Sequence, residues 1–434
     1  MQVIRLLFFL LIGVYCQLAF ATLQIQHWLT SSGVRVYFVE NRDLPILDLS
    51  VSFAAGSSLD TPEKSGRSNL TRHLLNLGAG GLNEDQIATG LADVGAQLGS
   101  HFDRDRASIS LRTLSGERER KQSLEIFSQI IQYPEFPENI LERERVRIIA
   151  GIREANTKPG YIADRALMKM LYGNHPYGLS DSGEISTLDA IQRSDLIEFY
   201  RAYYTAKNAV IAIMGDVSRI EAAAIAESMT GNLPSGESDN VLPPVQLPVG
   251  ETRRIAHPAT QSHILMAYPG LRRNDPDYFP LLVGNHILGG GGFVSRLMEE
   301  VRQARGLAYS VYSYFAPFRE AGPFQIGLQT KKEQADEALE LTQKVLADFI
   351  MGGPTEQELI AAKQNIVGGF PLRIDSNKKI LGYLAVIGFY NLPLTYLDDY
   401  IKAVEKVTVT EIKAAFQRRI KPERMVTVVV GDAE

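Results

Sequence analysis

The chain of 434 residues is poor in cysteine, in long apolar runs and in excess charge of one sign. Cys16 is the only cysteine, so no disulfide can form within the chain, and none of the four-cysteine patterns of a zinc finger is present. Beyond the N-terminus no segment reaches the roughly 18 consecutive apolar residues of a membrane-spanning helix. The 45 Lys and Arg against 50 Asp and Glu leave a net charge of -5. Because the two signs are interspersed, the basic face of a nucleic-acid binder is not predicted either.

Histidine is also scarce, with seven residues in the whole chain. Six of them show neither a His-x-His nor a His-x-x-x-His pairing on a plausible helix: His27, His101, His175, His257, His263 and His286. Metal sites built from paired imidazoles need such spacings, so these six predict no metal site.

The first 21 residues have the pattern of a secretory signal peptide. Arg5 is the lone basic residue before the apolar run 6–14, and residues 19–21 (Ala-Phe-Ala) put small side chains at the -3 and -1 positions of a cleavage site. We expect cleavage after Ala21, which removes Cys16 and exports the mature chain, with a bacterial periplasm as the predicted compartment. An uncleaved anchor is the alternative, whereas Tyr15 directly before Cys16 argues against a lipoprotein site.

The rest of the chain contains an internal repeat. Residues 199–216 are echoed by 416–432, with Gly215 and Gly431 lying 216 residues apart. Residues 72–75 are echoed by 285–288 at an offset of 213. Two matching offsets of about half the chain predict two similar halves, at residues 22–232 and 253–434. Between them, residues 233–252 are rich in Pro, Gly, Ser and acids, which is typical of an extended, semi-rigid linker.

Each half mixes strands and helices. Leu47, Leu49, Val51 and Phe53 alternate with polar residues, the period-two pattern of a half-buried strand, and residues 107–111 do the same. Residues 124–131 and 335–350 carry apolar side chains at helical spacing. We therefore predict an α+β fold in which each half has a mixed or antiparallel sheet with helices packed on one face.

The segment 66–75 holds what is left of a catalytic motif. Its residues read Asn69-x-x-Arg72-His73 where the inverted zinc-peptidase motif reads His-x-x-Glu-His. Such a site needs two imidazoles one helical turn apart, a distant carboxylate ligand and a carboxylate that activates the bound water. Asn69 is a poor zinc ligand, and Arg72 is a fixed cation that repels Zn²⁺ and cannot accept a proton. With a single potential ligand left, His73 is interpreted as an ordinary helix histidine.

With this motif in place, the chain resembles the pitrilysin/insulinase family of zinc peptidases, the inverzincins, over nearly all of the mature sequence. The resemblance rests on the order and spacing of several blocks: 33–39, 44–46, 55–58, the degenerate motif, 144–159, 203–216, 288–297 and 301–310. It implies a clamshell that forms half of a closed chamber. It also places the third zinc ligand, a Glu in the family, at Gly151, which cannot bind a metal. The nearest acids on that predicted helix are Glu144 and Glu154. The resemblance therefore implies that this chain holds no metal of its own.

The second half retains the other part of the family's machinery. Arg302 and Tyr309 match an Arg and a Tyr that family members contribute to peptide binding opposite the zinc, where both donate hydrogen bonds to a substrate carbonyl and its oxyanion. The alternative is that Arg302 is a surface cation and Tyr309 a core aromatic. The run Gly289, Gly290, Gly291 and Gly292 lacks the Gly-Lys-Ser/Thr ending of a phosphate loop. We interpret it as a tight bend that allows close backbone approach, and the resemblance implies an interface or hinge segment.

These observations support three functional hypotheses. The first is a non-catalytic, substrate-binding subunit of an exported two-chain zinc peptidase acting on unfolded peptides. In it a homologous His-x-x-Glu-His chain supplies the zinc, and this chain supplies Arg302 and Tyr309. The second is a structural or peptide-binding scaffold without hydrolytic role. The third, which the residues disfavour, is an independent zinc peptidase. The first predicts a protein partner and a peptide ligand, with no nucleic acid and, after signal cleavage, no membrane.

Overall fold

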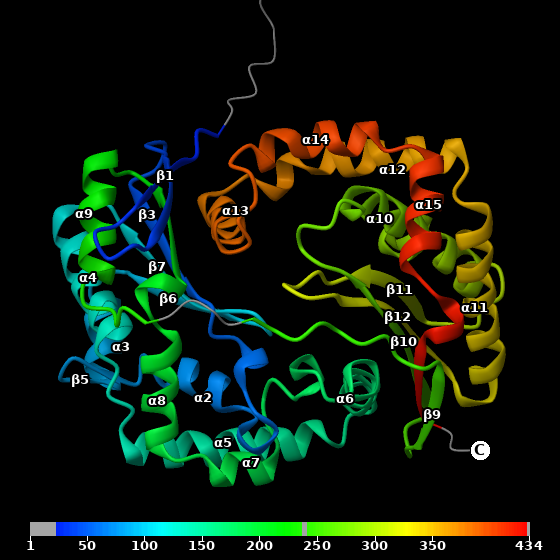
Figure 1. Cartoon of the computed structure of the whole chain (residues 1–434), viewed down its shortest axis with the longest axis horizontal. Coiled ribbons are helices and arrows are strands. Elements are labelled where there is room, and N and C mark those ends of the chain that lie inside the picture. The colour runs from blue at the N-terminus through cyan, green and yellow to red at the C-terminus, as the bar shows by residue number, and fades with distance from the viewer. Residues whose placement is uncertain (1–22, 237–240, 432–434) are drawn as a thin grey trace, which may run out of the picture.

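A computed structural model describes residues 23–236 and 241–431 of the chain. It shows two sheets that face each other, each covered by helices (Figure 1). This is the predicted α+β architecture with two halves. The predicted signal peptide, residues 1–21, lies outside the described residues.

The first sheet has six strands in the order β1-β2-β8-β3-β7-β6. Its strands are β1 (Gln26–Leu29), β2 (Arg35–Glu40), β3 (Ile46–Phe53), β6 (Gln97–Phe102), β7 (Ala107–Leu114) and β8 (Ala209–Gly215). A short separate pair consists of β4 (Gly78–Ala79) and β5 (Leu82–Asn83). The helices of this half are α2 (Arg67–Leu74), α3 (Glu84–Ala92), α4 (Glu117–Gln132), α5 (Glu138–Ala155), α6 (Pro159–Tyr172), α7 (Ile185–Ala190), α8 (Arg193–Tyr203) and α9 (Arg219–Thr230).

The second sheet has five strands in the order β11-β12-β10-β13-β9. Its strands are β9 (Glu251–Ala256), β10 (Gln261–Leu271), β11 (Ser310–Phe315), β12 (Gly322–Lys331) and β13 (Val426–Gly431). The helices are α10 (Tyr278–Asn285), α11 (Ala335–Gly352), α12 (Glu356–Gly369), α13 (Asn377–Phe389), α14 (Tyr396–Lys406) and α15 (Val409–Arg419), together with the π-helical turns η5 (His286–Gly290) and η7 (Met298–Gln303).

The two sheets share one connectivity, which confirms the two similar halves. Read from its parallel edge, the second sheet runs β9-β13-β10-β12-β11, and the first runs β2-β8-β3-β7-β6 after the extra β1. In each half the last strand, β8 or β13, lies parallel to the first strand and antiparallel to the second. The echoed glycines, Gly215 and Gly431, end these equivalent strands.

The apolar patterns of the sequence place the strands and helices where they were predicted, but β3 is not half-buried, because its polar residues Asp48, Ser50 and Ser52 are buried as well. Leu47, Leu49 and Val51 of β3 are fully buried in the core of the first half. Helix α4 buries Phe127 and Ile130 against the same core. Each such side chain contributes about 1.5–3 kcal/mol when it leaves water, so the apolar face decides which way these elements lie.

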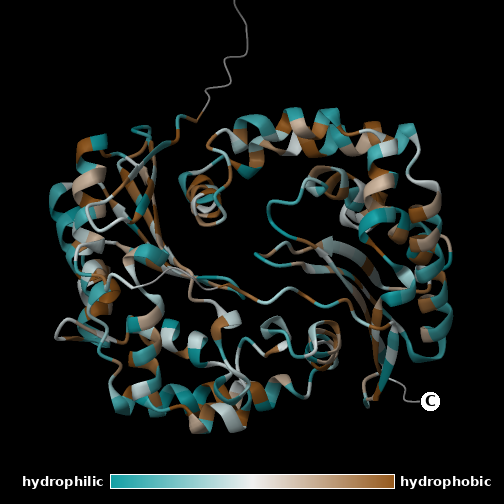
Figure 2. Cartoon of the chain, viewed as in Figure 1, coloured by the Kyte–Doolittle hydropathy of each residue, from teal (hydrophilic) through white to brown (hydrophobic). Residues whose placement is uncertain are grey.

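The halves exchange a helix, which the sequence analysis did not predict. Helix α13 of the second half packs on β8, β3 and β2 of the first sheet, while α6 of the first half packs on β10 and β13 of the second sheet (Figure 1). Gly388 allows α13 to come this close, because a Cβ there would lie 2.5 Å from Val210 Cγ1. Brown, apolar residues of α13 face the first sheet in Figure 2. Each sheet thus packs against its own helices on one face and against a helix of the opposite half on part of the other.

The predicted linker is extended and packed. Residues 241–250 contain neither helix nor strand and cross between the halves (Figure 1), and β9 begins at Glu251, just before the predicted linker end. Leu242 and Val245 pack against the α6 core cluster, and His175 Nε2 lies 2.9 Å from the Pro243 carbonyl oxygen. The connection is therefore anchored at residues 242–245.

A buried carboxylate joins the two halves. Asp105, in the turn between β6 and β7, is 2% exposed. It accepts hydrogen bonds from Tyr177 Oη (2.7 Å) in the first half, and from Tyr390 Oη (2.9 Å) and the Arg319 backbone N–H (2.7 Å) in the second. Three donors from three segments therefore depend on one acceptor.

Asp105→Ala is expected to lower the free energy of unfolding by about 3 kcal/mol, because it leaves two buried tyrosine hydroxyls and one N–H without an acceptor. Urea unfolding followed by far-UV circular dichroism measures the change. Asp93→Ala, which removes an exposed carboxylate, should stay within about 0.5 kcal/mol of wild type. Equal stability of the two variants would show that Asp105 does not hold the halves together.

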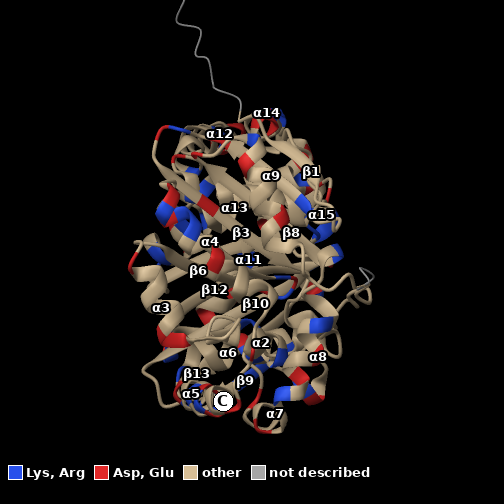
Figure 3. Cartoon of the chain, turned by 90° about the vertical axis from the view of Figure 1, so that its left-hand side faces the viewer, with Lys and Arg blue, Asp and Glu red and all other residues tan. Residues whose placement is uncertain are grey.

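Charged residues of both signs are interspersed over the face drawn in Figure 3, as the near-balanced composition leads one to expect. Among the described residues, none of the helices is long and apolar enough to cross a membrane.

Candidate functional site

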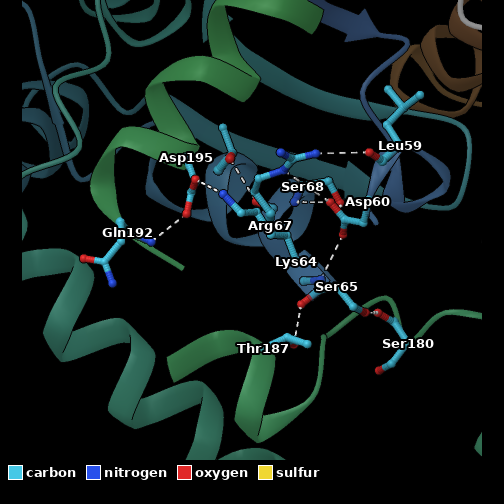
Figure 4. A network of polar contacts seen from close by, with 12 residues as sticks. Leu59, Asp60, Lys64, Ser65, Arg67, Ser68, Ser180, Thr187, Gln192 and Asp195 are labelled. Atoms are coloured by element: carbon cyan, nitrogen blue, oxygen red, sulfur yellow. Dashed lines mark hydrogen bonds and ion pairs between the residues drawn. The ribbon is translucent and has the colours of Figure 1, made fainter. Parts of the chain in front are cut away.

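Helix α2 carries the degenerate motif and begins in an unusual way. Its N-terminal residue Gly66 has a left-handed backbone (φ 93°) and offers no side chain to cap the helix. Asp60 takes that role, because its carboxylate accepts hydrogen bonds from the backbone N–H groups of Gly66 and Ser68 and from Ser68 Oγ, each at 2.9 Å (Figure 4). The start of the helix is thus fixed by a residue six positions upstream.

Two replaced motif positions now bond to each other. Arg72 Nη2 donates to Asn69 Oδ1 at 2.9 Å, and Arg72 Nη1 donates to Ser100 Oγ on the edge strand β6 at 2.9 Å. The guanidinium also lies 5.8 Å from the centre of the Phe102 ring. The amide and the cation thus tie α2 to β6, in the place where the family motif has a zinc ligand and a catalytic carboxylate.

The remaining motif histidine bonds to a carboxylate on α5. His73 Nε2 lies 2.8 Å from Glu144 Oε2, and Arg143 Nε donates to the other oxygen, Glu144 Oε1, at 2.9 Å. Glu144 is 2% exposed. Burial by itself raises the pKa of Glu144, yet the hydrogen bonds to His73 and Arg143 hold it below its usual value. The one imidazole left in the motif is therefore engaged by a buried carboxylate that Arg143 also contacts.

The position of the family's third zinc ligand carries no side chain that could bind a metal. Gly151 is exposed on α5, and a Cβ built on it would meet nothing within 4 Å. It lies seven residues after Glu144, and therefore about two turns along the same face of the helix. Glu154, the other nearby acid, pairs with Lys158 at 2.8 Å. Within residues 23–236 and 241–431 no group of three or more His, Cys, Asp or Glu side chains could hold a metal ion, so the residues present do not fit a zinc ion.

Sequence reasoning named Glu144 only as a nearby acid and missed its contact with His73, and it missed Ser100 altogether. The available signal for Glu144 was its spacing of seven from Gly151, which puts both on one helix face. No comparable signal exists for Ser100, because its contact with Arg72 depends on how β6 lies beside α2.

A charged turn ends the edge strand β6 beside this site. Asp103 Oδ2 accepts from Arg106 Nε (3.1 Å) and lies 2.8 Å from His101 Nε2, and Asp103 Oδ1 accepts from the backbone N–H groups of Asp105 and Arg106. Burial by itself raises the pKa of Asp103, but the hydrogen bond to His101 and the charge of Arg106 lower it to about 2.

This depressed pKa makes stability depend on pH. Because the folded pKa of Asp103 lies below its unfolded value of roughly 3.9, its contribution is complete above that value and is lost as pH falls toward 2. Asp103→Asn keeps the turn and removes the charge, so it should cost roughly 2–3 kcal/mol at pH 7 and almost nothing near pH 2. Urea unfolding of both proteins between pH 2 and 7 measures the difference, and a cost that does not change with pH would contradict it.

In the second half, Arg302 and Tyr309 lie together at the surface. Arg302 sits in the turn η7, with its guanidinium carbon 5.0 Å from the centre of the Phe293 ring and 5.8 Å from that of Tyr309. Both rings are largely exposed, at 66% and 74%. Tyr309 directly precedes β11, and its backbone N–H donates to the Gln329 carbonyl at 3.0 Å. Tyr309 is therefore not a core aromatic, and a cation between two exposed rings presents both side-chain donors to solvent. Sequence reasoning included Phe293 in the block 288–297 but gave it no role of its own.

The glycine run brings the turn η5 close to the edge strand β11. A Cβ on Gly289 would lie 2.4 Å from Ser313 Oγ, and one on Gly291 would lie 2.6 Å from the His286 carbonyl oxygen. Gly292 has a left-handed backbone (φ 64°), while Gly290 ends η5. Close backbone approach, predicted for this run, occurs here within the chain itself. The interface or hinge role stays a prediction.

Comparison with protein families matches most of the chain. The model described as "Insulinase (Peptidase family M16)" matches residues 35–183, and the model described as "Peptidase M16 inactive domain" matches residues 190–366. A Bacillus subtilis protein named "Uncharacterized zinc protease YmxG" is 26% identical over 354 residues, covering 81% of this chain and 85% of that protein. A Helicobacter pylori protein named "Non-peptidase homolog YmxG" is 26% identical over 411 residues, covering 94% of each.

Solved structures are similar over the same extent. A Pseudomonas fluorescens structure described as a "peptidase M16 inactive domain" is 40% identical, with a TM-score of 0.92 over 95% of this chain and 99% of that chain. A Helicobacter pylori structure described as a protease is 18% identical, with a TM-score of 0.87 over 94% of this chain and all of that chain. The second likeness shows the shared fold alone.

Proposed function

The chain belongs to the peptidase M16 (insulinase) family, and on that premise we propose that it is a non-catalytic, peptide-binding subunit of a two-chain zinc peptidase. A homologous chain with an intact His-x-x-Glu-His motif supplies the zinc and the attacking water. This chain supplies Arg302, Tyr309 and part of the wall of a chamber for unfolded peptides.

The residues at the motif positions of the first half support a non-catalytic role. Catalysis by a zinc peptidase needs a metal, a base and an open coordination position. In this chain the base position is Arg72, which is bonded to Asn69 and Ser100. The third ligand position is Gly151, and His73 already bonds Glu144. The names of two relatives, "inactive domain" and "Non-peptidase homolog", agree with this proposal.

The arrangement of Arg302 and Tyr309 carries the proposal. Both residues are held by local structure, η7 and the start of β11, while their donor groups stay at the surface. A guanidinium and a phenol fixed side by side can donate to a peptide carbonyl and to the oxyanion that forms when a metal-bound hydroxide attacks it. A scaffold without a hydrolytic role needs no donor to an oxyanion, so the effect of these residues on turnover separates the two hypotheses.

We also propose that the mature chain is exported, with a bacterial periplasm as its compartment. The support is the sequence pattern of residues 1–21, a short apolar run followed by Ala-Phe-Ala. Sequencing the N-terminus of the protein purified from its native source tests this, because cleavage after Ala21 leaves Thr22 as the first residue.

The function is tested by zinc content and peptidase activity of the mature chain, alone and mixed with its nearest homologue that has an intact motif. We expect no zinc and no turnover from this chain alone, little from the homologue alone, and turnover on mixing. Stoichiometric zinc with chelator-sensitive cleavage by this chain alone would contradict the proposal. Stable assembly without any gain in turnover would favour the scaffold instead.

A further inference from the structure

The inner face of the second sheet is only half covered. Helix α6 lies over β10 and β13, where Leu265, Ala267 and the valines of β13 are buried against it. Toward the free edge of the sheet, β12 and β11 extend beyond the helix (Figure 1). A cavity of about 270 Å³ lies there, between α6 and the edge strand. It is lined by residues of α6, β10, β11 and β12, among them Asp164, His263, Tyr312, Tyr314 and Gln325.

The pairing of β11 with β12 directs polar side chains into this cavity. Tyr312 lies opposite Gly327 and Tyr314 opposite Gln325, so these side chains share one face of the sheet. The missing side chain of Gly327 leaves room for Tyr312, whose Oη would lie 2.6 Å from a Cβ there. The two tyrosine rings stack with centres 6.2 Å apart and planes inclined by 14°. They form a half-exposed aromatic wall.

Two acceptors in the cavity have no donor. Gln325 is 3% exposed, and its Oε1 makes no hydrogen bond. Asp164, on α6, is exposed and makes neither a hydrogen bond nor an ion pair within the part of the chain that the structure describes, so its carboxylate is open to a ligand. A buried amide oxygen without a donor costs about 1–3 kcal/mol. A ligand that donates a hydrogen bond to this oxygen removes that cost, so the geometry favours binding of such a ligand.

Among the described residues no cation forms an ion pair with Asp164: desolvation raises the pKa of this carboxyl, and the charge of Arg104 offsets that only in part. Arg104, a nearby cation, donates from Nε to the Tyr177 carbonyl at 3.1 Å and pairs with Asp181 at 3.5 Å. Burial, and then the charge of His257, lower the pKa of His263, so His263 is neutral at pH 7. Burial, and then the negative charge of Asp164, raise the pKa of Tyr314 to about 12, which keeps its hydroxyl neutral as well.

We propose that this cavity is a subsite for a basic side chain, arginine above all, of a bound peptide. The inference rests on the proposed peptide-binding function and adds a specificity to it. Asp164 pairs with the guanidinium, Gln325 Oε1 accepts one of its N–H groups, and the faces of Tyr312 and Tyr314 attract the cation. A cavity of this size suits one side chain rather than a whole small-molecule ligand, since pockets for the latter usually exceed about 300 Å³.

The subsite lies within reach of the residues assigned to the peptide backbone. Tyr309, directly before β11, precedes Tyr312 by three residues, a distance of about 10 Å at the usual rise of a strand. The first half has no equivalent, because an offset of 213 places Gly99 and His101 at the positions of Tyr312 and Tyr314, and His101 is bonded to Asp103.

The test compares two fluorescein-labelled decapeptides that differ at one position, arginine or its neutral isostere citrulline. Fluorescence anisotropy at fixed ionic strength measures their binding to the mature chain, alone and with the intact-motif homologue. Wild type should prefer the arginine peptide by about tenfold or more. Asp164→Asn should weaken the arginine peptide to the level of the citrulline peptide and leave the latter unchanged. Glu154→Gln, which removes an exposed carboxylate just before α6, should leave the preference as in wild type.

The outcomes separate this inference from the proposed function. Equal binding of both peptides to wild type, or an undiminished preference in Asp164→Asn, would overturn the subsite and leave peptide binding intact. Titration of arginine amide, followed by the NMR signals of Tyr312 and Tyr314, tests the cavity without a peptide. If neither peptide binds but arginine amide shifts these signals in wild type and not in Asp164→Asn, the proposed function fails and the subsite stands. If arginine amide does not bind either, both are wrong.

Discussion

If the proposed two-chain peptidase forms, replacing Arg302 by Ala and Tyr309 by Phe together is expected to lower its kcat/KM by at least about 10²-fold, while the two chains still assemble. The loss of one oxyanion donor costs about 10²–10³-fold in other hydrolases, and the double change removes two donors. Neither side chain packs in a core, since Tyr309 is 74% exposed and Arg302 contacts two exposed rings. The folded chain should therefore be as stable as wild type.

Three measurements decide this prediction. Steady-state cleavage of an unfolded peptide gives kcat/KM, analytical ultracentrifugation gives assembly, and thermal unfolding gives stability. A matched control, Arg305→Ala with Tyr133→Phe, removes an exposed arginine of the same loop and an exposed tyrosine of the other half, and should change kcat/KM less than about twofold. Unchanged turnover in the Arg302 and Tyr309 variant would remove the observation on which the proposed function depends.

The combined substitution Asn69→His, Arg72→Glu and Gly151→Glu is expected to give this chain a site that binds one zinc ion. The changes restore two imidazoles one turn apart on α2, a carboxylate beside them, and a carboxylate on α5. Space for the last is available, because a Cβ on Gly151 meets nothing within 4 Å. Structural zinc sites with a full ligand set bind with roughly 10 kcal/mol or more, so a nearly complete site should retain the metal through purification.

The control is Asn69→His with Gly151→Glu, which leaves Arg72 in place. The fixed positive charge of Arg72 opposes a divalent cation, so this variant should retain far less zinc than the triple variant. Metal content is measured by inductively coupled plasma mass spectrometry after dialysis against a weak chelator. A folded triple variant without zinc would show that the geometry of α2 and α5, and not only the identity of three side chains, has departed from a zinc site.

Much of the architecture was predictable from local pattern. The alternation in β3 and β7, the helical spacing in α4 and α11, and the echoes around Gly215 and Gly431 correctly predicted two similar halves that each combine strands with helices. These patterns are readable because burial on one face imposes a period of two or 3.6 on the sequence. The continuous apolar run of β8 also indicates a strand that is buried on both faces, because it lacks alternation. Helix α13 covers the second of these faces.

The candidate site was predictable only in part. The motif positions Asn69, Arg72 and Gly151 follow from comparison with the inverted zinc motif, because each chemical requirement of that motif maps onto one residue. The contacts that now occupy the site do not follow, since Arg72 reaches Ser100 and His73 reaches Glu144 across 28 and 71 residues of sequence. Side-chain partners at such separations depend on packing, which a single sequence does not encode in any periodic form.

The sequence by itself determined that this chain has two related halves, an inverted zinc motif without the residues that bind zinc, and an Arg302 and Tyr309 pair in the second half. The reason is that these features depend on residue identity and local periodicity. Only the tertiary structure decided that the halves exchange α6 and α13, that Asp105 joins them, and that Asp164, Tyr312 and Gln325 meet in one cavity. Those contacts arise because apolar faces from distant segments must cover each other, and the polar groups between them take whichever partners that packing brings near.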